Sequence, residues 1–199
     1  MPKSRFYCII LLVLWLFSPA ASHKACGLDD GFGASASCEG KYFTVYYAPQ
    51  LDASALARQL DVSAADKILI GGSTQKWGSD SQANASGQRL VDMLDTLFLQ
   101  VSGILDMHIY SFHGSIKICR DYAHVNSIYK GFFDKDSGND SMYVSDLNTI
   151  YISAGNFKRE VLGHEIAHAI ISRYFVVQPP VKVAEVLAGY VEYQLRKKR

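Results

Sequence analysis

The chain has 199 residues, of which 49% are apolar, so it is long enough to bury the core of one compact domain. Its 20 Lys and Arg residues nearly balance its 19 Asp and Glu residues, and the formal net charge is +1. This balance excludes the strongly basic overall field that would attract nucleic acid or anionic lipid.

The first 22 residues are typical of a secretory signal peptide. Lys3 and Arg5 give a positive start, residues 6–17 (FYCIILLVLWLF) are apolar, and residues 18–22 are small enough for a signal-peptidase site. The apolar run is shorter than the about 20 residues of a membrane-spanning helix; a retained anchor is the alternative. We therefore expect an exported protein, periplasmic or secreted, with residues 23–199 as a single domain and no membrane span after cleavage.

Three cysteines remain after removal of this segment. Cys26 and Cys38 flank a stretch rich in Gly, Ala and Ser and could close a loop, whereas Cys38–Cys119 is the competing disulfide. Cys119 lies in an apolar alternating run, which favours a buried small apolar side chain. Their spacing does not indicate a cysteine-rich metal site.

The first half of the remaining chain combines one strand with helices. Residues 41–48 are aromatic and β-branched, which favours a strand, and Asp52 can cap a helix over residues 53–60. Residues 71–88 are polar and rich in glycine, which predicts an exposed loop. Apolar residues at helical spacing then predict a helix over residues 90–105.

The second half alternates short strands and loops before two closing helices. Strands are predicted at 107–112, 115–119, 142–144 and 149–153, a turn-rich loop at 130–141, and helices at 157–175 and 183–196. Pro179-Pro180 separates the two helices. This order of elements indicates an α+β fold.

The first closing helix contains the sequence His164-Glu165-Ile166-Ala167-His168. Two histidines four residues apart lie on one face of a helix, about 6 Å apart along the axis, so both imidazoles can reach one Zn²⁺. Glu165 lies about 100° further round, where a carboxylate can take a proton from the water that attacks a peptide carbonyl. The structural alternative is a pair of hydrogen-bonded core histidines with Glu165 in solvent.

A catalytic zinc site usually has a third protein ligand. The last helix offers Glu185 and Glu192, seven residues apart on one face, and Glu185 is the predicted ligand because it is in the first turn after the prolines. Glu192 is expected to be exposed near the basic C-terminus, with orientation of a histidine ligand as the alternative. Tyr190, Tyr174 and His113 are candidates for stabilising an oxyanion.

The segments HEIAHAI and PPVKVAEVLAGYVEY resemble the gluzincin metallopeptidases, and most closely the small peptidase MA-like proteins. In that pattern HExxH is followed by a proline and a helix that carries the glutamate ligand, which matches Glu185; Ala188, Tyr190 and Glu192 fall on the rest of the pattern. Val186 departs from it, because the family has Gly there, and no residues remain for a large C-terminal lobe.

The resemblance implies a zincin-like fold: a small mixed sheet whose edge strand lies over an active-site helix, with a closing C-terminal helix. Residues 149–153 are the expected edge strand, which would pair with an extended peptide. We expect a zinc metallopeptidase that acts on a peptide or protein. The rivals are a non-catalytic secreted binding module on the same scaffold and a zinc amidase that acts on cell-wall material.

Overall fold

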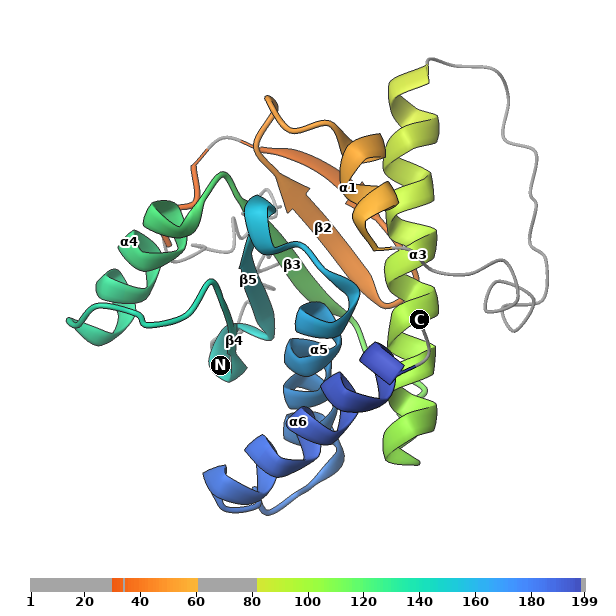
Figure 1. Cartoon of the computed structure of the whole chain (residues 1–199), viewed down its shortest axis with the longest axis vertical. Helices are drawn as coiled ribbons and strands as arrows, with labels where there is room; N and C mark the ends of the chain where they lie inside the picture. The colour runs from red at the N-terminus through yellow and green to blue at the C-terminus, as the bar shows by residue number, and fades with distance from the viewer. Residues whose placement is uncertain (1–29, 34, 61–81, 198–199) are drawn as a thin grey trace, which may run out of the picture.

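The computed structural model describes residues 30–33, 35–60 and 82–197, which form a mixed α+β fold (Figure 1). This part of the chain contains one five-stranded sheet and five α-helices. The predicted signal peptide and Cys26 lie outside the described residues.

The sheet is mixed and has the strand order β1-β2-β3-β5-β4. β2 (Phe43–Tyr47) pairs with β1 (Ala36–Glu39) in antiparallel orientation and with β3 (Gly114–Cys119) in parallel. β5 (Thr149–Ser153) runs parallel to β3 and antiparallel to β4 (Ser141–Val144). β1 and β4 are therefore the edge strands.

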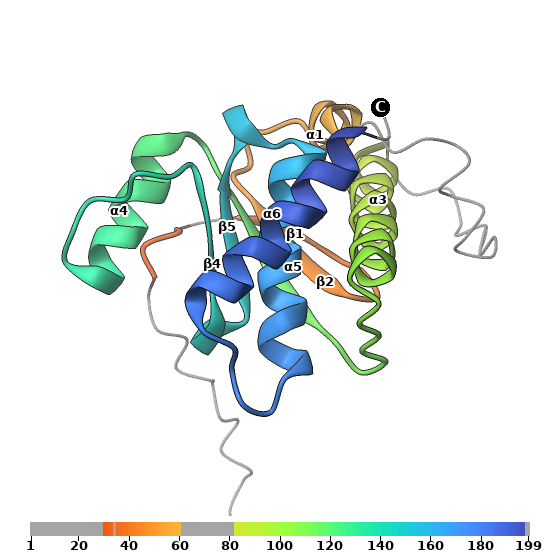
Figure 2. The same ribbon diagram turned by 60° about the horizontal axis from the view of Figure 1, so that its bottom comes forward.

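Helices cover both faces of the sheet (Figures 1 and 2). One face is covered by α1 (Ala53–Gln59), α3 (Gln82–Leu105), α5 (Arg159–Tyr174) and α6 (Val181–Lys197), and the other by α4 (Tyr122–Phe133). The main core lies between the sheet and the first group of helices, and a smaller apolar cluster lies under α4.

Alternation along β3 explains the two cores. Ile116 and Ile118 belong to the main core, whereas Cys119 belongs to the cluster under α4 and Lys117 points to the same side. Successive side chains of a strand point to opposite faces, so one strand supplies both layers.

Most predicted elements are present. Asp52 caps α1 by accepting a hydrogen bond from the Ser54 backbone N–H at 2.9 Å. The structure confirms the predicted elements below, with ends that shift by at most two residues except for the helix at 90–105, which begins eight residues earlier. They are the strand at 41–48, the helices at 53–60, 90–105, 157–175 and 183–196, the strand at 115–119, and the hairpin of 142–144 with 149–153.

The predicted loop at 71–88 is wrong over residues 82–88, which form the start of α3; residues 71–81 lie outside the described part. These first turns pack against β1. A Cβ atom on Gly87 would lie 2.3 Å from Cys38 Sγ, so the glycine is needed for this close contact rather than for a loop.

The predicted strand at 107–112 is wrong, because the chain turns back at the end of α3. Asp106 is left-handed (φ 53°), and Met107 donates its backbone N–H to the Ser102 carbonyl at 3.0 Å. Phe112 is buried and stacks on Phe98, with 4.8 Å between ring centroids. The segment thus closes the end of the core without pairing in the sheet.

The predicted loop at 130–141 begins too early, since α4 continues to Phe133. Asp121 caps this helix through the His124 backbone N–H at 2.8 Å, and Asp134 ends it in the left-handed conformation. The helix and β1 were not expected from the sequence.

The predicted edge strand at 149–153 is also wrong. β5 is paired on both sides, and β4 is the edge strand next to α5. All five residues of β5 are buried, which is typical of an interior strand.

Cys38 and Cys119 are free thiols, so the Cys38–Cys119 disulfide is excluded. Cys119 is fully buried, as its apolar surroundings predicted, and burial raises its pKa to about 12. Cys38 lies beside the hydroxyl of Tyr47.

Candidate metal site

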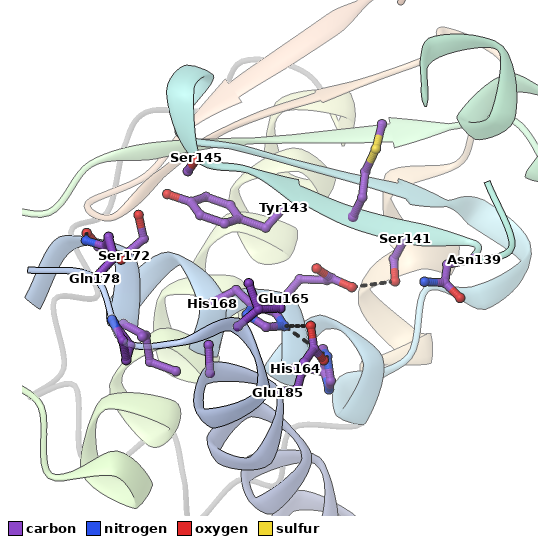
Figure 3. A pocket seen from close by; sticks show the side chains of 15 residues that line it. Asn139, Ser141, Tyr143, Ser145, His164, Glu165, His168, Ser172, Gln178 and Glu185 are labelled. Atoms are coloured by element: carbon purple, nitrogen blue, oxygen red, sulfur yellow. Dashed lines mark hydrogen bonds and ion pairs between the residues drawn. The ribbon is translucent and has the colours of Figure 1, made fainter. Parts of the chain in front are cut away.

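The histidine motif is held by the buried side of α5. Leu162, Ile166 and Ile170 are fully buried in the main core. His164 and His168, one turn apart, therefore lie on a different side of the helix, where Figure 3 shows them beside Glu185 of α6.

α6 returns across α5 after the Pro179-Pro180 turn (Figure 2). The Pro180 carbonyl accepts from the backbone N–H of Val183 at 2.8 Å, which starts the helix. The two helices approach closely at Gly163, where a Cβ atom would lie 2.1 Å from Leu195 Cδ1. This approach brings Glu185 to the histidines.

His164, His168 and Glu185 place three ligand atoms in a triangle. The two histidine Nε2 atoms are 3.1 Å apart, and the Glu185 oxygens lie 3.5 Å from each Nε2. Ligand atoms at about 2.0–2.1 Å from a tetrahedral zinc ion lie about 3.3–3.4 Å from one another. The three groups therefore fit three corners of a tetrahedral site, and within the described ranges they form the one cluster of this kind.

The protonation state of His168 suits metal binding. Burial lowers the pKa of His168, and the neighbouring His164 lowers it further, so the imidazole is neutral near neutral pH. A metal ligand must be the neutral imidazole. The Glu185 side chain is half-exposed, which leaves the triangle open to solvent on one side.

Glu192 lies behind His164. One carboxylate oxygen is 3.5 Å from His164 Nδ1, and the other accepts a hydrogen bond from Arg196. Its side chain is only 32% exposed, so the expectation that it is an exposed residue is wrong. Its position fits the alternative, orientation of a histidine ligand.

Glu165 is turned from the triangle toward the sheet. Its carboxylate accepts a hydrogen bond from the Ser141 hydroxyl of β4 at 2.8 Å, and its side chain is buried (Figure 3). Burial raises the pKa of this carboxyl, which outweighs the opposing effects of the Ser141 hydrogen bond and of His164. The alternative with Glu165 in solvent is therefore excluded.

A cavity of about 420 Å³ lies between β4, α5 and α6. It is lined by both histidines, Glu165 and Glu185, and Tyr143 of β4 also faces it. A volume of this size suits a small ligand or a few residues of a peptide. Ser141 and Tyr143 were not predicted as site residues, because no local pattern signals the contact of β4 with α5.

The tyrosine and histidine candidates for an oxyanion are not brought to this cavity. Tyr190 is nearly half-exposed on α6 and is not among the lining residues. Tyr174 packs on Phe175, and His113 bonds to Thr44 elsewhere on the sheet. Tyr143 is the tyrosine that lines the cavity.

A second cavity, of about 620 Å³, lies on the opposite face of the sheet. Its charged groups satisfy each other: Asp30 accepts hydrogen bonds from Lys117 and from the Tyr151 hydroxyl. The Lys117 ammonium also lies over the rings of Phe32 and Tyr46.

Comparison of the chain with protein-family models, with curated proteins and with solved structures finds no match. Among the described helices, none is long and apolar enough to cross a bilayer.

Proposed function

We propose that this chain is an exported zinc metallopeptidase with a zincin-like fold of the gluzincin type. The observation that carries the proposal is the triangle of ligand atoms from His164, His168 and Glu185, with the Glu165 carboxylate buried beside it. The resemblance of the two closing helices to the gluzincin pattern supports the same function.

His164, His168 and Glu185 would hold one zinc ion, which when bound polarises the scissile carbonyl and lowers the pKa of water to about 7. The chain's part is to keep the His168 imidazole neutral and to aim the Nε2 atoms of both histidines at one point. Glu192, next to His164 Nδ1, favours the tautomer that leaves Nε2 as the ligand atom.

Glu165 is the proposed general base and acid. Its contact with Ser141 keeps it out of the ligand set while it stays next to His164 in the chain. The carboxylate takes a proton from the attacking water and delivers it to the leaving amine. A raised pKa suits both steps, because the group must accept and release a proton near neutral pH.

The proposed substrate is a peptide or protein in extended conformation. β4 is an edge strand, and two of its residues, Ser141 and Tyr143, line the cavity. An extended peptide can add to such an edge through backbone hydrogen bonds. β4 is therefore the strand that we propose for the role of the gluzincin edge strand.

The first experiment is the metal content of the purified protein, measured by mass spectrometry. We expect about one zinc ion per chain and its loss in His168→Ala. A wild-type chain that is folded but binds no more zinc than His168→Ala contradicts the proposal.

The second experiment separates an enzyme from its rivals. Glu165→Gln should retain zinc and lose cleavage of a peptide library by about 10²–10⁴-fold, whereas Glu160→Gln at the start of α5 is the matched control that should cleave normally. A wild-type protein that binds zinc and cleaves no peptide indicates a binding module. Chelator-sensitive cleavage of cell-wall crosslinks alone indicates an amidase.

A further inference from the structure

The outward side of α6 carries an apolar stripe. Val183, Val186, Tyr190 and Tyr193 follow one another at intervals of three, four and three residues, which places them on one face of the helix. All four are exposed, Val186 by 66% of its surface. The buried residues of α6 are on the other side, and in Figure 2 α6 lies in front of α5 with its outward side uncovered by the described elements.

The turn that leads into α6 adds two valines. Val176 is fully exposed and Val177 is 83% exposed. Isolated apolar residues on a surface are ordinary, but four in a row along one face of a helix mark an interaction surface.

The charged residues on this face of α6 are basic. Lys182 and Lys197 fall on the same face of α6, at its two ends. The helix has only two acidic residues, Glu185 and Glu192, and both lie beside the histidines. Lys198 and Arg199 follow in the sequence. The near-neutral total charge does not reveal these two lysines on one face, and stabilisation of a helix C-terminus accounts for Lys197 but not for Lys182.

We propose that the outward face of α6 rests on an anionic lipid surface. Valine and tyrosine side chains would enter the headgroup region, where tyrosine keeps its hydroxyl in water, and the lysines at both ends would contact lipid phosphates. Pairing with a second copy fits less well, because two stripes in contact would bring these lysines together without a carboxylate to neutralise them.

This arrangement is independent of the proposed peptidase activity, but it sets the location of the site. Glu185 and the cavity lie on the neighbouring side of α6. A chain that rests on lipid through α6 would therefore open its cavity close to the bilayer surface.

The test is co-sedimentation of the purified protein with vesicles. One set contains phosphatidylcholine alone and the other equal parts of phosphatidylcholine and phosphatidylglycerol. Mass spectrometry establishes that all variants have the same N-terminus. We expect binding to the anionic vesicles only, and release by added salt.

Two variants and two controls test the surface itself. Lys182→Ser with Lys197→Ser should weaken binding roughly 30-fold, from about 1 kcal/mol per basic residue. Val186→Ser with Tyr193→Ser should weaken it about tenfold. The matched controls are Arg89→Ser with Lys135→Ser and Tyr110→Ser, which remove exposed residues of the same kinds elsewhere.

Three results overturn the proposal. The first is no binding to anionic vesicles by a protein whose circular dichroism shows it to be folded. The second is binding that both α6 variants leave unchanged, because another segment, such as residues 6–17, then carries it. The third is a dimer that the Val186→Ser, Tyr193→Ser variant dissociates while lipid binding is absent.

Discussion

At the scale of single residues, Glu192 shows that α6 contributes more than one carboxylate to the candidate site. It faces His164 Nδ1 at 3.5 Å, and that nitrogen is buried without a well-aligned hydrogen bond from the described residues. Arg196 holds the other oxygen of Glu192. A carboxylate in this position can fix the orientation of a histidine that binds a metal.

We expect Glu192→Gln to reduce zinc affinity by about 10–100-fold while the chain stays folded. Competition with a chromogenic chelator measures the dissociation constant, and Glu160→Gln serves as the control for loss of a carboxylate on these helices. An unchanged dissociation constant would mean that the carboxylate does not act on His164.

At the scale of elements, the sequence predicted the features that depend only on residues close together in the chain. The repeat of apolar residues predicted α3, and the HExxH spacing predicted α5 with both histidines on one side. Glu185 could be predicted from the first turn after the prolines, because a helix that returns directly must face its predecessor.

The features that the sequence did not predict depend on contacts distant in the chain. Ser141 reaches Glu165 because β4 is the edge strand beside α5, and no pattern in either segment indicates that pairing. α4 has only two buried residues, Val125 and Ile128, which give too weak an apolar repeat. Apolar and polar residues alternate over residues 107–112 as they do in a strand. The left-handed turn at Asp106 instead directs this segment across the end of the core, where it does not pair in the sheet.

Gly163 and Gly189 test whether the approach of α6 to α5 positions the ligands. Alanine at Gly163 would meet Leu195 Cδ1 at 2.1 Å, whereas alanine at Gly189 meets open space. We expect Gly163→Ala to destabilise the chain by about 1–2 kcal/mol and to weaken zinc binding, since Glu185 shifts with α6. Gly189→Ala should stabilise it by about 0.5–1 kcal/mol.

Urea unfolding and zinc titration measure both effects. Adding Leu195→Ala to Gly163→Ala should remove most of the clash, so the two changes should be non-additive. Equal effects of the two glycine substitutions would show that the helices separate without cost.

At the scale of the whole molecule, Asp30 ties the N-terminal end of the described chain to the sheet. It accepts hydrogen bonds from Lys117 of β3 and Tyr151 of β5, and its side chain is 8% exposed. Burial raises the pKa of Asp30, but the bonds from Lys117, Tyr151 and the Phe32 backbone outweigh it, so the pKa lies below its ordinary value.

A carboxyl with a lowered pKa stabilises the fold above its unfolded pKa of about 3.9, and the effect is lost as the pH falls through the lower folded value. We expect Asp30→Asn to reduce the free energy of unfolding by about 1–3 kcal/mol at neutral pH. The difference from wild type should shrink only below about pH 4. Urea unfolding across this range measures it, with Glu39→Gln on the exposed edge of β1 as control; a difference that is constant with pH contradicts the assignment.

Zinc would couple the two closing helices to each other and so to the stability of the whole chain. α6 is the last element, held by Ala188, Val191 and Leu195 in the core, and a metal shared by α5 and α6 adds a second link. A ligand that binds only the folded state at about 1,000 times its dissociation constant adds about 4 kcal/mol to stability. For a chain of this length we expect zinc to raise Tm by about 10 °C and a chelator to reverse it.

Calorimetry should show the same rise in Glu165→Gln, which keeps all three ligands, and no rise in His168→Ala. Magnesium should not replace zinc, because it requires oxygen ligands in octahedral geometry. A rise of equal size in His168→Ala would place the stabilising zinc elsewhere on the chain and remove the physical basis for the peptidase.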